Sequence, residues 1–372
     1  MNSNNRTPYI VAFPHPGDEH LVSKPNRQAY DPEKVDEYIN DEKRRKKYAA
    51  QQYKELISND AGTMWWNNSE HKRKFIRATG HMISKNDFDI FLENKTINTN
   101  LSELCFWGEL EYPTYFEKIP YTTIHDTRYP TYIHTPVPQK RLDILNKTEK
   151  ELQTIYDSII IDTKNNRLYE PSMGKQNTDP YVFGDNFMYS CCKQVKNRKP
   201  SKLQNLFPGD IIVYYSLRKN EIGFSCLLDT VFVVEKVVGR YKRNDYKEIQ
   251  NKVSELYFQN VILPIHYGCG NSIDDEGSYT LYKAATPSSP VNGMFSYFPC
   301  KEYSEKINCG FPRYEIKDGH LTDAIQIKSQ QGFAIKSTDD SDSQYNLWLS
   351  LTQNILNSGY NLGTHVPEPV FE

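Results

Sequence analysis

Phe207-Pro208-Gly209-Asp210, followed at once by Ile211-Ile212-Val213-Tyr214-Tyr215, is the stretch that decides the fold. A Pro-Gly pair predicts a tight turn, and the run of β-branched and aromatic residues after it predicts a buried strand. A polar segment, Arg218 to Gly223, then leads into a second apolar run from Phe224 to Val238. Two such runs joined by a short polar loop predict a β-hairpin. We therefore expect a β-rich core that contains this hairpin.

Weaker signals on either side of the hairpin suggest how the rest of the chain is organised. Residues 8–13, 70–84 and 103–118 read as strands, and Asp31-Pro32 combines a helix N-cap with a proline in the first turn. Residues 342–357 have the spacing of an amphipathic helix. We expect an α+β fold with helical and loop insertions, divided into an N-terminal segment with one long helix (1–95), a β-rich barrel core (96–335), and a C-terminal helix and tail (336–372).

The composition narrows the class of protein. The chain has 372 residues and a net charge of -2, so no overall charge draws it to a polyanion, and nucleic-acid binding would depend on local patches. Aromatic residues make up 13%, with 27 Tyr, whereas the mean hydropathy is -0.72. No apolar run approaches the roughly 18 residues that span a bilayer. Seven scattered cysteines include no C-x-x-C pair. We expect a cytoplasmic protein with reduced thiols and no membrane partner.

Seven short blocks combine aromatic, charged and turn-forming residues. Their spread along a β-rich chain predicts one composite pocket built from many loops. The blocks are residues 15–20, 65–75, 106–109, 177–180, 183–185, 207–210 and 292–295.

The first block places two imidazoles and two carboxylates within six residues: His15, Asp18, Glu19 and His20. These groups suit either metal binding or acid–base catalysis. Adjacent side chains of an extended segment point in opposite directions, so only some of the four would converge. The alternative is a charged loop in which the aspartate caps the turn.

The second and third blocks predict a binding surface. Trp65, Asn67, His71, Lys72 and Arg73 interleave positive charge with rings, which is what recognition of a phosphate and a base requires. The alternative is a basic sheet edge that discourages strand pairing. Trp107 and Glu109 alternate along an expected strand, where the ring would stack a base and the carboxylate would accept hydrogen bonds or act in catalysis. The alternative is a tryptophan in the core.

The fourth and fifth blocks contribute polar residues around two phenylalanines. Asn177, Asp179 and Asp185 suit turns, and they are candidates for ligand binding in the same pocket. The adjacent Cys191 and Cys192 would need a histidine partner to act as nucleophiles. No pattern supplies one, so buried packing is the simpler interpretation.

Three resemblances add expectations. The Pro-Gly-Asp turn, the apolar strand and the returning Val-rich strand resemble the centre of PUA-like barrels, the superfamily of the ASCH, EVE and YTH domains. This likeness covers Leu203 to Val238 and implies a central antiparallel barrel whose aromatic cavity accepts a modified base or nucleotide. The whole set of blocks is similar to a family of uncharacterised bacterial proteins, which implies no chemistry. Pro14 to Glu19 is also similar to the metal-binding motif of LmbE-like deacetylases, but Gly17 stands where their general base should be.

Three functions follow as hypotheses. The first is a nucleic-acid or nucleotide reader with an aromatic pocket and a basic rim, in phage defence or DNA modification. The second is an enzyme that acts on a nucleotide or modified base through the His/Asp/Glu residues. The third is a structural partner in a complex, since tyrosines also serve protein interfaces. The sequence has no P-loop and no dinucleotide fingerprint, so it does not support the cofactors that those motifs bind. The metal content and any other cofactor stay unknown.

Overall fold

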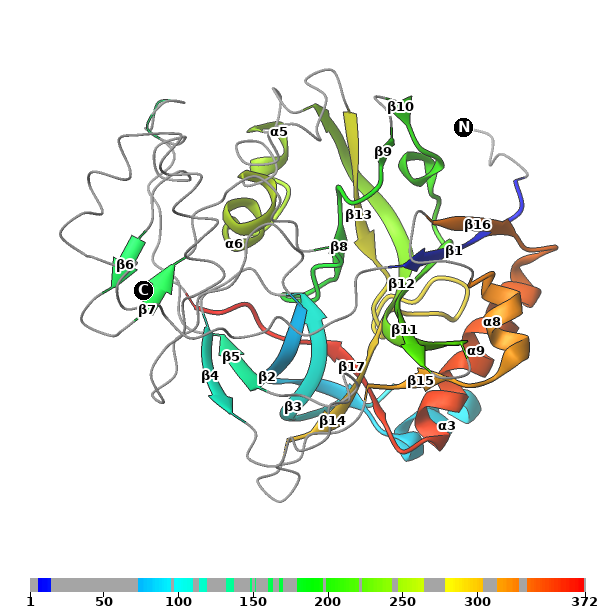
Figure 1. The fold of residues 1–372 in the computed structure, drawn as a ribbon. Helices are drawn as coiled ribbons and strands as arrows, with labels where there is room; N and C mark the ends of the chain where they lie inside the picture. The colour runs from blue at the N-terminus through cyan, green and yellow to red at the C-terminus, as the bar shows by residue number, and fades with distance from the viewer. Residues whose placement is uncertain are drawn as a thin grey trace.

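The structure of the chain is a computed structural model (Figure 1). It describes residues 6–14, 73–94, 97–109, 114–118, 132–136, 148, 151, 160–162, 167–169, 179–196, 199–220, 223–242, 247–263, 278–303, 313–327 and 333–370.

The expected hairpin is confirmed, and it forms the centre of a mixed sheet. Strand β11 (Ile211–Asn220) pairs antiparallel with β12 (Gly223–Lys242), and Ile211 lies opposite Val233. The strand β1 (Tyr9–Pro14) joins the other edge of β11 in parallel. The complete order is β16 (Ala334–Ser337), β1, β11, β12, β13 (Ser278–Ala284) and β8 (Met188–Tyr189), with β15 (Glu315–Ile316) also paired to β12.

The Pro-Gly-Asp turn starts β11 in the way the sequence predicts. Gly209 adopts a positive φ of 90°, and its N–H donates to the carbonyl of Val234 at 2.8 Å. The Asp210 carboxylate accepts the backbone N–H groups of Phe207 and Tyr9, each at 2.8 Å, and forms an ion pair with Arg6. One buried carboxylate therefore fixes the turn and ties β1 to it.

The barrel, in contrast, is built from other strands than the hairpin. A second sheet has the order β17 (Asn361–His365), β14 (Phe298–Glu302), β3 (Asn100–Glu109), β2 (Arg73–Ile83), β5 (Tyr132–Pro136) and β4 (Thr114–Lys118). Because β17 also pairs with β2, strands β2, β3, β14 and β17 close into a four-stranded antiparallel barrel. The hairpin stays in the open mixed sheet, where β1 and β13 occupy its two edges.

Two glycines let such a small barrel close. A Cβ atom on Gly363 would lie 2.0 Å from the ring of Phe298, its partner on β14, and a Cβ on Gly80 would lie 2.6 Å from the carbonyl oxygen of His365. Neither neighbour has room to move, since Phe298 is fully buried and the other contact is to backbone. Close approach of the strands therefore requires glycine at both positions.

The Gly363→Ala variant should be destabilised by about 3 kcal/mol, the upper end of the usual range, because overpacking of a filled core forces side chains and backbone to shift. The free energy of unfolding from urea titration measures the effect. Gly319→Ala is the matched control, since a Cβ there meets nothing within 4 Å. If the two variants unfold at the same urea concentration, the contact with Phe298 does not restrict the barrel.

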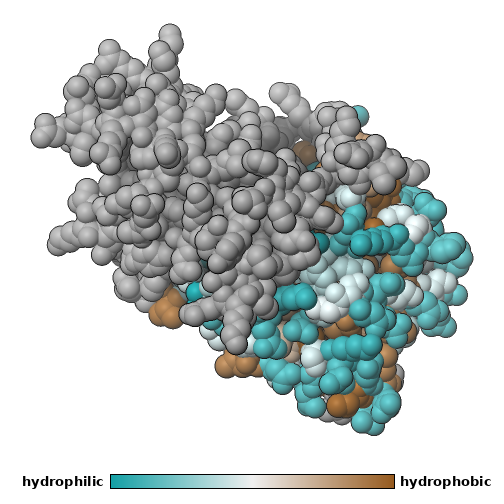
Figure 2. Space-filling model, turned by 60° about the horizontal axis from the view of Figure 1, so that its bottom comes forward, coloured by the Kyte–Doolittle hydropathy of each residue, from teal (hydrophilic) through white to brown (hydrophobic). Residues whose placement is uncertain are grey.

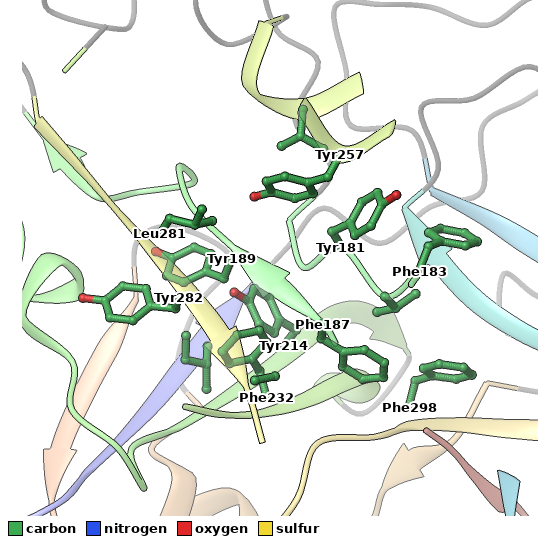
Figure 3. Packing of buried hydrophobic residues seen from close by; sticks show 14 of the residues in the cluster. Tyr181, Phe183, Phe187, Tyr189, Tyr214, Phe232, Tyr257, Leu281, Tyr282 and Phe298 are labelled. Carbon is green, nitrogen blue, oxygen red and sulfur yellow. The ribbon is translucent and has the colours of Figure 1, made fainter. Parts of the chain in front are cut away.

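Both faces of strand β1 are buried in the core. Val11 and Phe13 belong to one buried cluster, and Ile10 and Ala12 belong to another. Helix α9 (Ser341–Asn357) covers the second cluster with Trp348, whose indole N–H donates to the carbonyl of Phe295 at 3.0 Å. The first cluster is rich in tyrosine and phenylalanine (Figure 3).

The remaining elements are short, and several of them border the site described below. They are α3 (Lys85–Asn94), β6 (Ile160–Asp162), β7 (Arg167–Tyr169), β9 (Val195–Lys196), β10 (Lys199–Pro200), the 3-10 helix η2 (Lys202–Asn205), α5 (Lys247–Gln250), α6 (Glu255–Tyr257), the π-helical turn η4 (Phe258–Ile262) and α8 (Gly319–Ile325). Within the described ranges, no helix has the length and apolar character to cross a bilayer. On the face shown in Figure 2, hydrophobic residues are interspersed among hydrophilic ones.

The three expected segments share both sheets. From the N-terminal segment, β1 lies inside the mixed sheet and β2 inside the barrel, while β17 from the C-terminal segment closes that barrel. The C-terminal helix predicted at residues 342–357 is confirmed as α9, and the strand predicted at 70–84 is confirmed as β2. The helix predicted after Asp31 lies outside the described residues.

Candidate functional site

A cavity of about 590 Å³ opens where four segments meet. One is the turn between Tyr181 and Met188, and the second comprises Val238 of β12 with the chain from Asn251 to Tyr257. The third is the end of β17 and the chain that follows it, and Lys283 of β13 is the fourth. The lining residues are Tyr181, Phe183, Gly184, Asp185, Asn186, Met188, Val238, Asn251, Lys252, Val253, Ser254, Tyr257, Lys283, His365, Pro367 and Glu368. Its volume is typical of pockets that bind small molecules.

Specific hydrogen bonds hold these segments together. The N–H of Gly184, which has a positive φ of 81°, donates to the carbonyl of Val366 at 2.8 Å. The carboxylate of Glu368 accepts the hydroxyl of Tyr181 at 2.6 Å and that of Ser254 at 2.5 Å. Glu368 thus links the C-terminal segment to the 181–188 turn and to the chain that begins α6.

The floor is aromatic and the walls are polar. Tyr181, Phe183 and Tyr257 are buried under the cavity, and the rings of Tyr181 and Tyr257 meet edge to face with centroids 4.8 Å apart. Figure 3 shows these two rings side by side, with their hydroxyls pointing in opposite directions. Asp185 and Asn251 are exposed at the rim. A ligand would therefore meet hydrogen-bonding groups around its edge and a rigid apolar base beneath it.

His365 is an ionisable group of the pocket whose pKa is shifted by its surroundings. Its ring lies against His81, with centroids 5.5 Å apart. Burial, and then the neighbouring His81, lower the pKa of His365 below its ordinary value, whereas Asp185 and the backbone of Gly184 act in the opposite direction. The imidazole is consequently neutral at pH 7, and it offers the pocket a flat ring with one nitrogen lone pair.

Two lysines supply positive charge. Lys283 of β13 is partly buried and forms an ion pair with Glu235 at 3.6 Å. Lys252 follows α5, is exposed, and also lines the cavity. Cations from two segments favour a ligand that carries negative charge.

A second polar centre lies in the core near this floor, around Asp179. Its fully buried carboxylate accepts three backbone N–H groups, from Ser190 at 3.1 Å, Cys191 at 2.8 Å and Cys192 at 2.7 Å. Burial raises the pKa of Asp179 to about 7; the three hydrogen bonds oppose this shift, and the charge of Glu109 adds to it. Burial, followed by the charge of Asp179, also raises the pKa of Tyr257 well above its usual value.

The residues predicted as catalytic are only partly described. Glu109 is buried at the end of β3, opposite Arg73 in the strand register and close enough to affect Asp179. The Lys193 ammonium donates to the carbonyl of Pro14, so the end of β1 lies beside the turn that follows Cys192. His15, Asp18, Glu19 and His20 lie outside the described residues.

The residues predicted to bind a ligand are separated by the structure. Asp185 lines the pocket, whereas Asp179 is enclosed in the core and holds the 190–192 turn. Trp107 is only 3% exposed and packs on Phe75, with ring centroids 4.9 Å apart. Its other neighbour is the guanidinium of Arg313, 4.2 Å from the ring centroid. Trp65, Asn67, His71, Lys72 and Asn177 lie outside the described residues.

Trp107 therefore occupies the core position that was its alternative interpretation, and it does not line the pocket. The expectation that Trp107 stacks a base is therefore wrong, because both faces of β3 are buried where it pairs with β2. The pocket residues that sequence reasoning missed are His365, Lys283, Lys252, Tyr257 and Glu368. None belongs to a local motif. His365 and Lys283 reach the pocket through long-range pairing, of β17 with β2 and of β13 with β12.

No protein-family model matches the chain, and no curated protein or solved structure matches it. What the pocket binds must be inferred from its chemistry.

Proposed function

We propose that this protein binds a nucleotide, free or as one unit of a nucleic acid, in the pocket under Glu368. One observation carries the proposal: a cavity of about 590 Å³ is lined by lysines from two segments, by amide and carboxylate groups at the rim, and by rings below. A cation binds the phosphate, hydrogen-bonding groups bind the edge of the base, and rings contact its face.

The phosphate would lie between Lys252 and Lys283. Both lysines line the cavity, and Lys283 also forms an ion pair with Glu235. The phosphate oxygens would form charge-assisted hydrogen bonds with the lysines.

The base would lie beside the phosphate. Met188, which is paired with Lys283 across β8 and β13, offers aliphatic contact together with Val238 and Val253, and the neutral His365 offers a ring face. Asp185 and Asn251 would bond the polar edge of the base, since a carboxylate accepts from an exocyclic amino group and an amide both donates and accepts. A modified base fits the same chemistry, because the aliphatic wall would contact an added methyl group.

The finer fold assignment is part of this proposal. The order of Pro-Gly-Asp turn, β11 and returning β12 supports a PUA-like type through this hairpin alone, since the hairpin lies in the open mixed sheet and not in the barrel. Membership of the bacterial family rests on the sequence blocks named above. In this proposal the rings of the pocket floor and of His365 contact the base, which was the role expected for Trp107.

The Lys283→Ala variant should bind a nucleoside triphosphate at least about tenfold more weakly, since one hydrogen bond to a charged group contributes about 1.5–3 kcal/mol and about 1.4 kcal/mol is a factor of ten. Isothermal titration calorimetry at fixed salt measures the affinity. Lys85→Ala, an exposed lysine on α3 outside the pocket, is the control and should bind like the wild type.

Equal affinities for Lys283→Ala and the wild type would contradict the placement of the phosphate. Turnover of the nucleotide in the same solution would point to the enzymatic alternative. A complete lack of nucleotide binding by the wild type would leave the structural-partner hypothesis in its place.

A further inference from the structure

Two histidines face each other across the strands that close the barrel. His81 of β2 and His365 of β17 are partners in the antiparallel register, and their ring centroids lie 5.5 Å apart with an angle of 64° between the ring planes. The register shifts between Gly363 and His365, so that His365 rather than Thr364 is the partner of His81. An irregularity of this kind re-aims a side chain, and it is common beside functional sites.

The spacing of the two rings suits a shared metal ion. An ion bound about 2.0–2.1 Å from one nitrogen of each ring would hold the two centroids about 5 Å apart. The observed separation is 5.5 Å, so little movement is needed. Both side chains are only partly buried, so an ion can reach the rings from solvent and keep water among its ligands.

One nitrogen of each ring already has a partner. Nδ1 of His81 lies 3.1 Å from the hydroxyl oxygen of Thr99. The hydrogen bond between His365 and the backbone of Gly184 raises the pKa of the ring, so the imidazole donates it and the carbonyl accepts it. Metal-binding histidines typically donate one ring N–H to such an outer partner, which leaves the lone pair of the other nitrogen for the ion.

A carboxylate lies close to the pair. Asp185 follows Gly184, and its charge acts on the ring of His365. Within the described part of the chain, however, no three side chains of His, Cys, Asp or Glu are grouped so that they could hold a metal ion. The protein would therefore supply two ligands, and Asp185 would attract the ion through its charge. Water, or a donor atom of a molecule in the cavity, would complete the coordination.

We infer that His81 and His365 together bind a divalent transition-metal ion of the class of Zn²⁺ at the edge of the cavity. His365 lines that cavity, which places the ion at its border. Imidazole nitrogen suits Zn²⁺, Ni²⁺ and Co²⁺, whereas Mg²⁺ and Ca²⁺ prefer oxygen ligands. This inference goes beyond the proposed function, because the ion would bind with or without a nucleotide. The alternative is a cross-strand pair of rings that only pack on each other.

Isothermal titration calorimetry of the full chain with Zn²⁺ alone, in the absence of nucleotide, tests the inference. The His81→Ala variant loses one of the two protein ligands and should bind Zn²⁺ more than about 100-fold more weakly, since the loss of an outer partner alone costs about 10–100-fold. Thr99→Val removes such a partner at an exposed position and should weaken binding about tenfold. His320→Ala, an exposed histidine on α8, is the matched control and should bind Zn²⁺ like the wild type.

Co²⁺ identifies the ligands of the bound ion. The chain also contains seven cysteines, and thiolates bind the same metals. A thiolate ligand gives bound Co²⁺ an intense charge-transfer band in the near ultraviolet, which imidazole and water do not. We expect a visible Co²⁺ spectrum without this band. The spectrum should be lost in His81→Ala, should persist in excess Mg²⁺, and should disappear when Zn²⁺ is added.

Three results would overturn the inference: no Zn²⁺ binding by the wild type, equal affinity of His81→Ala and the wild type, or a thiolate band in the Co²⁺ spectrum. The rings would then form a packed pair only. The urea unfolding midpoint without metal shows whether each variant is folded. If His81→Ala does not fold, Thr99→Val decides the question, because weaker Zn²⁺ binding supports the site and unchanged binding contradicts it.

Discussion

The Arg313→Ala variant is expected to lose about 3–5 kcal/mol of its free energy of unfolding, because it leaves a buried carboxylate without its partner cation. The Arg313 side chain is fully buried, it pairs with Asp229, and it donates to the hydroxyl of Ser216. Its guanidinium also covers Trp107. One side chain therefore connects β11, β12 and the barrel strand β3.

Urea titration followed by tryptophan fluorescence measures this loss. Lys317→Ala is the control, since Lys317 is exposed four residues further along, and we expect a change within about 0.5 kcal/mol. Replacing both partners, as in Arg313→Met/Asp229→Leu, should restore much of the stability, because no uncompensated charge remains. If Arg313→Ala is as stable as the control, the buried pair does not support the packing of Trp107.

The Asp179→Ala variant is expected to lose about 3–5 kcal/mol near pH 5, because it leaves three buried backbone N–H groups without an acceptor and each such group costs about 1–3 kcal/mol. The 190–192 turn would lose the interactions that shape it, and Tyr189 at the start of that turn packs against Tyr282 in the core. The floor of the pocket should loosen as a result, so nucleotide affinity should fall together with stability.

The effect of Asp179 on stability should depend on pH. The pKa of this carboxyl rises from 3.8 to about 7 on folding, so the folded state holds a proton that the unfolded state releases. The stability that Asp179 contributes is then fully present below about pH 4 and is lost as pH rises to about 7, by an amount on the order of 4 kcal/mol.

Comparison with Asp179→Asn isolates this dependence, because asparagine does not titrate, whereas Glu109 and the other carboxyls are present in both proteins. The stability of the wild type relative to Asp179→Asn should decrease from pH 5 to pH 8, as measured by urea titration at each pH. A constant difference across this range would show that Asp179 is already ionised at pH 5 in the folded protein.

Local signals predicted the local elements well. The hairpin β11–β12 has two apolar runs and a short polar loop, strand β2 has an alternating pattern, and helix α9 has amphipathic spacing; each formed where expected. Asp210 was expected to brace its turn, and its hydrogen bonds show that it does. Such features depend on residues within a few positions of one another, which a single sequence displays.

Long-range pairing was not predictable in the same way. The barrel closes because Gly363 meets Met82 across a sequence separation that no periodicity records. The same register brings His365 to His81, and without it neither residue suggests a site. The burial of Trp107 could not be predicted either. Alternation along β3 does not show that Phe75 of β2 and the guanidinium of Arg313 both pack on the Trp107 ring.

The central claim is that a nucleotide occupies the cavity between the 181–188 turn, the α5–α6 region and the chain after β17. Photo-crosslinking with an azido-adenosine nucleotide, followed by mass spectrometry of the digested protein, tests it most directly. The account predicts labelled peptides within residues 181–188, 251–257 or 365–368, and protection of these peptides by unlabelled nucleotide. Labelling confined to other parts of the chain, or labelling that unlabelled nucleotide does not reduce, would contradict it.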